Sequence, residues 1–287
     1  MDGILLGGGS GSRLTPLTIS TNKHFFPVYD KPMIYYSLSI LLLSNVKQVT
    51  LICDKSSIDQ YRKLLGEGEE FGIKINYSLQ NSPDGLPHAI ATGLNEFPME
   101  KFMVVLGDNF LYGREFFNKF DKNEFDEKNV IFYQKVSDPT GFGVLDFDVN
   151  GKLKRLIEKP DYHVSNYVAI GVYIFDKNYL NYYEKIKKSS RGEYEIIDII
   201  NSYLDDEKII PFNLGRGMSW LDMGSYDSLA TGTSFVKSIQ DRQNILVNSP
   251  HEIAFRKGLI NSDLLASLIE NNPGSQYYQN LNEILDN

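Results

Sequence analysis

GILLGGGSGSRLTPLTISTNKHFFPVYDKP spans residues 3–32 and takes a short apolar run directly into a loop rich in glycine. An apolar run that ends in glycine is typical of a buried strand feeding a loop. Because glycine has no Cβ, the backbone N–H groups of such a loop can approach a phosphate chain closely. Arg13 ends the loop and Lys23 follows ten residues later, and both cations suit phosphoryl oxygens. The stretch therefore predicts a strand and a loop that bind a polyphosphate.

Two well-known phosphate loops do not match this segment. It is not a Walker A loop, because no Gly-Lys-Ser/Thr ends it at the required spacing. It also fits the dinucleotide fingerprint poorly, because no acidic residue closes a second strand in the expected role. A plain strand-to-helix turn with two solvated surface cations remains an alternative interpretation.

Strand and helix patterns alternate outward from this loop through roughly the first 110 residues. The expected strands cover residues 3–8, 48–54, 74–80 and 102–109, and the expected helices cover 33–46, 58–65 and 85–97. This alternation predicts a doubly wound, mainly parallel sheet whose ligands bind at the carboxyl ends of its strands. The motifs GGGSGSR, QNSPDG and GDN all fall at such ends, which places an active site there.

The pattern changes after residue 130. Shorter strands follow up to residue 175, with a hairpin turn at DVNGK (148–152). A helix is expected within residues 193–206, then a strand, a loop and a long helix within 217–243. The last 40 residues have a helical pattern that Asn-Asn-Pro-Gly (271–274) interrupts. We therefore expect one continuous α/β domain, Rossmann-like with a small β-hairpin subregion, and a helical C-terminal appendage.

Composition excludes several classes of partner and site. The formal net charge of -8 offers no general surface for nucleic acid. Cys53 is the single cysteine, and the four histidines have no metal-ligand spacing, so neither a disulfide nor a zinc site is expected within the chain. The sequence opens without a signal-peptide pattern and has no run long enough to span a bilayer, so we expect a cytoplasmic protein without a membrane partner.

Carboxylates follow two of the expected strands. Asp108 comes just past the apolar run of VVLGDN, and Asp222 has a similar setting in GMSWLDMG. Mg²⁺ commonly binds one or two carboxylates together with substrate phosphates, so this pair would suffice, although either residue alone could also cap a turn. Glu158 and Lys159 end another strand pattern, and they offer an acceptor for hydroxyls and a cation for a second phosphate.

These motifs together resemble the sugar-nucleotidyltransferases, and in particular the glucose-1-phosphate thymidylyltransferases. The family signature Gly-x-Gly-Thr-Arg-Leu-x-Pro, followed by a spaced lysine, is similar to the segment beginning at residue 9. The resemblance covers nearly the whole chain, in order, through QNSPDGL, VLGDNFLYG, FGVLDFD, EKP, SRGEYEIIDI, GRGMSWLDMG and EIAFRKG.

The resemblance implies a role for each matching residue. It implies that the nucleotide is bound by Gly8, Gly11, Ser12, Arg13, Gln80 and Gly85. It implies that the catalytic residues are Arg13, Lys23 and Asp108, and that Mg²⁺ is bound by Asp108 and Asp222. It also implies that the sugar phosphate contacts Gly143, Glu158 and Lys159. Arg13 would draw charge from the leaving pyrophosphate, and Lys23 would lie between the two reacting phosphates. Gln80 and Gly85 would read the thymine base.

The resemblance also implies a reaction and an assembly. Glucose 1-phosphate would attack the α-phosphorus of dTTP in line, giving dTDP-glucose and pyrophosphate in the first step of deoxysugar nucleotide biosynthesis, such as a rhamnose or amino-deoxysugar pathway. Residues 1–240 would form the nucleotidyltransferase domain, with a nucleotide-binding part (1–110) and a sugar-binding part (111–240). Residues 241–287 would pack between the subunits of a homotetramer and help to form a feedback site for a dTDP-sugar.

Three alternatives stay open on the sequence. The enzyme could use UTP, CTP or another sugar phosphate, the chain could be a catalytically inactive nucleotide-sugar regulator, or it could be a Rossmann oxidoreductase. The chain departs from the family pattern at Ser12, at His24-Phe25-Phe26, at Pro87, at Gly141-Phe142 and at Met223. These departures bear on the choice of base and sugar more than on the class of reaction.

Overall fold

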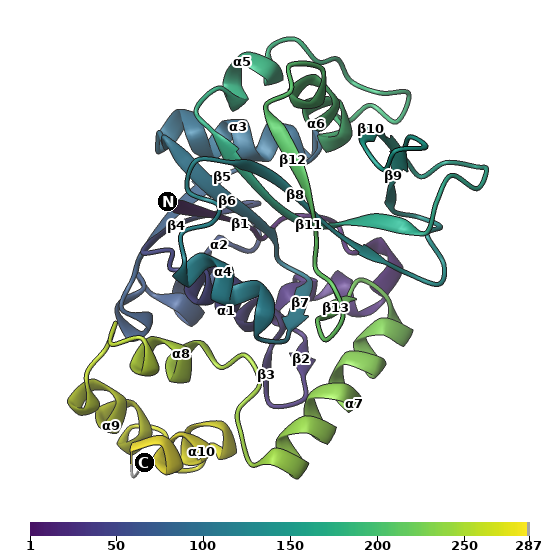
Figure 1. The fold of residues 1–287 in the computed structure, drawn as a ribbon. Helices are drawn as coiled ribbons and strands as arrows, with labels where there is room; N and C mark the ends of the chain where they lie inside the picture. The colour runs from purple at the N-terminus through teal and green to yellow at the C-terminus, as the bar shows by residue number, and fades with distance from the viewer. Residues whose placement is uncertain (286–287) are drawn as a thin grey trace.

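The computed structural model describes residues 1–285, and one mixed sheet of nine strands forms the centre of that part of the chain (Figure 1). The strands are β1 (Asp2–Leu6), β4 (Gln48–Cys53), β5 (Lys74–Leu79), β6 (Lys101–Leu106), β8 (Asn129–Lys135), β9 (Gly143–Phe147), β10 (Leu153–Glu158), β11 (Tyr167–Asp176) and β12 (Ile209–Asn213). Their order is β10-β9-β11-β6-β1-β4-β5, with β8 paired to β11 and to β12.

The first half of the chain supplies the parallel part of this sheet. β1 pairs in parallel with both β4 and β6, and β4 pairs in parallel with β5. The carboxyl ends of these four strands therefore lie at one edge of the sheet. On the other side, β11 runs antiparallel to β6, and β9 and β10 form a hairpin whose turn is closed by the Asp148 N–H donating to the Lys152 carbonyl at 2.9 Å.

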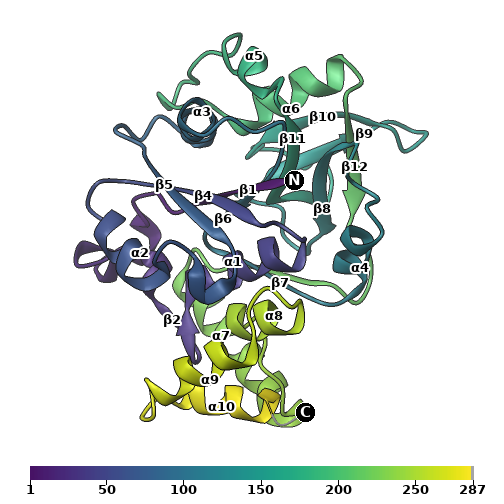
Figure 2. The same cartoon turned by 90° about the vertical axis from the view of Figure 1, so that its left-hand side faces the viewer.

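Helices cover both faces of the sheet, as Figure 2 shows. One face carries α1 (Met33–Leu43), α2 (Ile58–Leu65) and α4 (Glu115–Asp121), and the other carries α3 (Leu86–Glu96), α5 (Tyr179–Tyr183) and α6 (Ile196–Asp205). Side chains along a strand alternate between the two cores: Leu5 packs with the α1 face, whereas Ile4 and Leu6 pack with the α3 face. The predicted fold class, a doubly wound and mainly parallel α/β sheet, is confirmed.

The C-terminal residues form helices below the sheet. They comprise α7 (Tyr226–Gln243), α8 (Pro250–Arg256), α9 (Ser262–Glu270) and α10 (Gln276–Leu285), and α8 packs against α1 (Figure 1). The proposed boundary at residue 240 falls in the last turn of α7 and stays a prediction. Among residues 1–285, no helix is both long enough and apolar enough to cross a membrane.

One predicted strand is wrong at its end. The run 102–109 does not continue through Asn109, because β6 stops at Leu106 and a new strand, β7 (Asn109–Tyr112), begins after Gly107-Asp108. β7 leaves the main sheet and pairs antiparallel with β13 (Ser219–Asp222). The turn between β6 and β7 brings the first of the two predicted metal-binding carboxylates beside the strand that carries the second.

Candidate active site

A cavity of about 260 Å³ opens at the carboxyl edge of the parallel strands. Six of the predicted site residues line it, namely Arg13, Asp108, Gly143, Glu158, Lys159 and Asp222. Residues from four distant segments thus meet at one place, as the strand-end argument requires. The other six predicted residues do not line this cavity, namely Gly8, Gly11, Ser12, Lys23, Gln80 and Gly85, although Leu86, directly after Gly85, does.

The glycine-rich loop leaves β1 in a fixed direction. The Gly7 N–H donates to the Ile52 carbonyl at 2.8 Å, so the chain is still held to β4 as the loop begins. Gly9 and Gly11 then take φ values of 110° and 57°, which other residues rarely adopt. Leu14, fully buried, anchors the far end of the loop. The loop is therefore pinned at both ends, and its glycines supply the conformation between them.

Arg13 extends from this loop toward the cavity. Its side chain is 65% exposed, and its Nη2 lies 3.7 Å from Asp222 Oδ2. The Tyr226 hydroxyl donates to the Thr15 carbonyl at 2.8 Å and so ties the loop to the first turn of α7. An arginine that is exposed and held loosely by a carboxylate is free to turn toward an anionic ligand.

Lys23 and Asp108 form a close ion pair at the floor of the site. Lys23 Nζ lies 2.5 Å from Asp108 Oδ2, and both side chains are only 13% exposed. Burial is the largest single influence and raises the pKa of Asp108, but the charge of Lys23, its hydrogen bond to Asp108 and the other neighbouring groups together outweigh burial, so this pKa lies below its usual range. Asp108 is therefore ionised at neutral pH, and Lys23 is held beside the glycine-rich loop, since a Cβ on Gly11 would lie 3.6 Å from Lys23 Cβ.

Asp222 is placed beside Asp108 by backbone pairing. β13 pairs with β7 so that Asp222 faces Asn109, and the Met223 N–H donates to the Asp108 carbonyl at 3.1 Å. Burial and the negative charge of Asp108 raise the pKa of Asp222 to about 6. Because the two partly buried carboxylates repel each other, a cation bound between them would be favoured.

This donor set fits Mg²⁺ better than it fits a softer metal. It offers carboxylate oxygens alone, which hard cations prefer, and Mg²⁺ usually completes its octahedron with phosphate oxygens and water. Within residues 1–285, no group of three or more metal-ligating side chains lies together. The site thus suits a metal that arrives with a phosphate-bearing substrate.

The far wall of the cavity comes from the β9–β10 hairpin. Glu158 Oε1 accepts from Arg191 at 3.0 Å and lies 3.4 Å from Lys159 Nζ. A Cβ on Gly143 would lie 2.9 Å from an Ile197 methyl group and 3.8 Å from Glu158 Oε2, so a larger side chain would crowd this wall. One carboxylate between two cations is suited to bind a ligand that carries both hydroxyls and a phosphate.

The QNSPDG loop forms a separate wall next to the glycine-rich loop. Gln80 Nε2 donates to the Gly85 carbonyl at 3.2 Å, and its Oε1 would lie 3.7 Å from a Cβ on Gly8. Gly85 has a φ of 98°, and a Cβ there would lie 2.2 Å from the Tyr194 carbonyl oxygen. The structure thus brings Gln80 and Gly85 to the edge of the phosphate loop.

Trp220, Asn109 and Arg191 are among the cavity residues that carried no predicted role. Trp220 Nε1 donates to Asn109 Oδ1 at 2.7 Å, and Asn109 Nδ2 donates to the Gly171 carbonyl at 2.9 Å. Arg191 bridges Glu158 and Glu195. The available signals were weak: Trp220 is the single tryptophan of the chain, and Arg191 lies in the family-like motif SRGEYEIIDI.

A phosphate loop, two cations and paired carboxylates at one edge of an α/β sheet define an enzyme that transfers nucleotidyl groups. The profile of the nucleotidyl transferase family matches residues 2–239. A glucose-1-phosphate thymidylyltransferase of Mycolicibacterium smegmatis is 38% identical over 100% of this chain and 99% of its own length. One from Neisseria meningitidis serogroup A is 37% identical, with 99% of each chain covered.

Solved structures agree with the sequence relatives. A Bacillus anthracis crystal structure, assigned as a glucose-1-phosphate thymidylyltransferase, is 32% identical with a TM-score of 0.75, and the match covers 82% of this chain and 94% of that one. The chain therefore belongs to the nucleotidyl transferase family, among the glucose-1-phosphate thymidylyltransferases.

Proposed function

We propose that this enzyme condenses dTTP and glucose 1-phosphate to dTDP-glucose and pyrophosphate. The observation that carries the proposal is the Lys23–Asp108 pair, set beside Asp222 at the end of a glycine-rich phosphate loop. The names of the full-length relatives support the choice of substrates. The product would supply deoxysugar nucleotide biosynthesis.

The proposed reaction is a single in-line displacement. An oxygen of the sugar phosphate attacks the α-phosphorus of dTTP, a new P–O bond forms, and the bond to pyrophosphate breaks. No covalent enzyme intermediate is required, so catalysis consists of positioning and of neutralising phosphate charge. Lys23 holds the reacting phosphates together, Arg13 stabilises the leaving pyrophosphate, and Lys159 binds the phosphate of the sugar.

Asp108 and Asp222 would hold Mg²⁺ in this scheme. When bound, the metal supplies positive charge to the phosphate oxygens and orients the triphosphate. Glu158 accepts hydrogen bonds from sugar hydroxyls once substrate has drawn Arg191 away from it. Gln80 and the backbone of Gly85 contact the thymine edge. Each of these roles belongs to a residue that the fold brings to the same edge of the sheet.

The test is pyrophosphate release from a panel of triphosphates with glucose 1-phosphate. We expect dTTP to give the highest kcat/KM. UTP lacks the 5-methyl group and carries an additional 2′-hydroxyl, so dUTP is included in the panel to isolate the methyl group, which is worth about 1–3 kcal/mol. A tenfold or greater preference for UTP or CTP contradicts the thymidylyl assignment and favours the related transferase. A catalytically inactive regulator would show nucleotide binding without turnover, and the charged pair of Lys23 and Asp108 argues against it.

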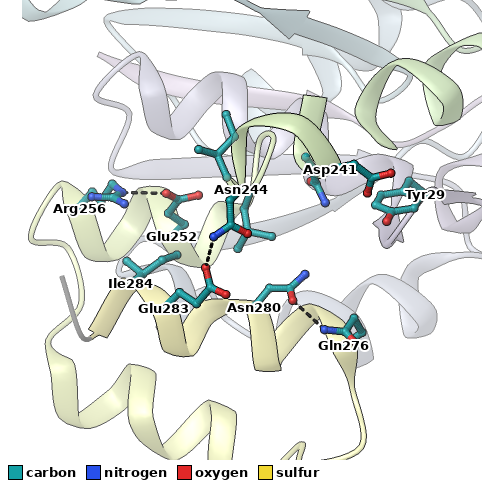
Figure 3. A pocket seen from close by; sticks show the side chains of 12 residues that line it. Tyr29, Asp241, Asn244, Glu252, Arg256, Gln276, Asn280, Glu283 and Ile284 are labelled. Carbon is teal, nitrogen blue, oxygen red and sulfur yellow. Dashed lines mark hydrogen bonds and ion pairs between the residues drawn. The ribbon is translucent and has the colours of Figure 1, made fainter. Parts of the chain in front are cut away.

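We also propose a feedback site for a dTDP-sugar in the C-terminal region of a homotetramer. Two pockets meet at Glu252 and Arg256, which lie in the EIAFRKG motif. The pocket in Figure 3, of about 480 Å³, lies between α7, α8 and α10 and is lined mostly by amides and carboxylates. The other, of about 650 Å³, places Arg114 and Lys257 beside Tyr112, a combination of cations and an aromatic ring that suits a nucleotide.

Inhibition by a dTDP-sugar provides the test of this second site. We expect inhibition that dTTP does not fully relieve, and that Arg114→Ala weakens while leaving kcat unchanged. Purely competitive inhibition, equal in the wild type and in Arg114→Ala, would place the inhibitor in the active site alone. Light scattering at working concentration tests the homotetramer.

A further inference from the structure

The segment His24-Phe25-Phe26 contains a buried imidazole at the ends of two central strands. His24 is 1% exposed. A Cβ on Gly107, at the end of β6, would lie 2.7 Å from His24 Nε2. A Cβ on Gly7, at the end of β1, would lie 2.8 Å from the Tyr61 hydroxyl oxygen. Both glycines therefore leave room for the same pair of rings.

The two rings meet at the Gly7 carbonyl, where the phosphate loop begins. The Tyr61 hydroxyl donates to this carbonyl at 2.8 Å, and Asn22 Nδ2 donates to it at 2.9 Å. His24 Nδ1 lies 2.7 Å from the Tyr61 oxygen. With the Tyr61 proton on Gly7, the tautomer protonated at Nδ1 donates to the Tyr61 oxygen, and Nδ1 also lies 3.2 Å from the Gly7 carbonyl oxygen. Burial lowers the pKa of His24 to about 3, which agrees with a neutral ring.

This contact sits next to the catalytic ion pair on both sides. Lys23 precedes His24 within one 3-10 turn, Lys23–Phe25. Asp108 follows Gly107, the residue that faces the imidazole. A change in the position of the ring would therefore be passed to both members of the pair through one peptide unit each.

We propose that His24 and Tyr61 are positioning residues that set Lys23 against Asp108 and against the start of the phosphate loop. They touch no substrate and act through the ammonium of Lys23. The inference rests on the proposed function, since the turnover that it modulates is nucleotidyl transfer.

The test compares Tyr61→Phe with a matched control. We expect Tyr61→Phe to lower kcat about tenfold or more with little change in KM, because displacing a catalytic group by about 1 Å can cost roughly 100-fold. Tyr36→Phe is the control, because the Tyr36 hydroxyl is likewise buried and donates to a backbone carbonyl, that of Val28, at 2.7 Å. Rates are expressed per folded molecule, measured by circular dichroism.

Variants of His24 separate positioning from simple support of the fold. His24→Asn keeps an amide nitrogen near the position of Nδ1 and should retain most of kcat, whereas His24→Leu should lose as much as Tyr61→Phe. The double variant His24→Leu/Tyr61→Phe should lose less activity than the product of the two single losses, because both changes break the shared His24–Tyr61 contact, while Tyr61→Phe also removes the hydrogen bond to Gly7.

Two results would overturn the inference. One is equal kcat in Tyr61→Phe and Tyr36→Phe, and the other is a double variant whose loss is the product of the single losses. Failure of the proposed function is recognised separately, since the wild type would then release no pyrophosphate from dTTP and glucose 1-phosphate.

Discussion

The buried His24 predicts a measurable loss of stability in mild acid. In the folded protein burial holds the pKa of this imidazole at about 3, against 6.5 for a free histidine, so the native ring stays neutral where the unfolded ring takes up a proton. The neighbouring Lys23 ammonium lowers the pKa further, and Asp108 opposes it. The contribution of His24 to the free energy of unfolding is therefore fully present above pH 6.5 and decreases as the pH falls toward 3.

The size of the effect follows from linkage. Each pH unit between the two pKa values changes the free energy of unfolding by about 1.4 kcal/mol. Moving from pH 7.5 to pH 5.0 should therefore remove about 2 kcal/mol through His24 alone. Other carboxylates and histidines also titrate over this range, so the quantity to measure is the difference between the wild type and His24→Asn, which lacks the ionisable ring.

Urea denaturation followed by circular dichroism at the two pH values measures this difference. We expect the wild type to lose about 2 kcal/mol more than His24→Asn over this range. His163→Asn serves as the control, because His163 is exposed, and it should lose as much as the wild type. Equal losses in the wild type and in His24→Asn would refute the argument that the imidazole is buried and neutral.

Three further outcomes follow from the site. Gly85→Ala should lower the free energy of unfolding by more than about 2 kcal/mol, because the new Cβ would lie 2.2 Å from a carbonyl oxygen. Gly141→Ala, also at positive φ but with open space around it, should lower the free energy of unfolding by only about 1 kcal/mol. Equal shifts in melting temperature for the two variants would contradict this. Lys23→Met should lower kcat by about 100-fold or more in steady-state assays, and activity near the wild type would remove Lys23 from the mechanism. Trp220→Phe leaves Asn109 Oδ1 without its donor, and the Trp220 ring packs against Phe142 next to Gly143, so this change should raise KM for the sugar phosphate more than KM for the triphosphate. Equal changes in the two KM values would contradict a role for Trp220 at the far wall of the cavity.

Local sequence pattern was sufficient for much of the fold. β1 and β4 are apolar runs, β5 has an alternating pattern, and turn residues bound the helices. β1, β4, β5 and α2 therefore lie within a residue or two of their predicted limits. β12 was not predicted, because Pro211 interrupts its pattern, and it survives as an edge strand paired with β8 alone. β7 was not predicted, because the expected strand 102–109 ended in Gly-Asp-Asn and the short apolar run Phe110–Tyr112 after it was not assigned to a strand.

Local sequence pattern likewise predicted some residues of the site and missed others. Motifs at strand ends indicated Arg13, Asp108 and Asp222, because parallel strands bring their carboxyl ends together. The bond from Trp220 to Asn109 joins residues 111 positions apart, and no local pattern encodes such a contact. The catalytic roles themselves stay predictions from the resemblance, which the geometry makes specific enough to test.

The most direct test of the central claim follows the configuration at the α-phosphorus. The enzyme is given dTTP that carries sulfur in place of one α-oxygen, as a single stereoisomer, together with glucose 1-phosphate, and the configuration of the thio-substituted dTDP-glucose is determined. One in-line displacement, arranged by Lys23, Arg13 and the two carboxylates, predicts inversion. Retention would require two displacements through a covalent enzyme intermediate and would contradict the account.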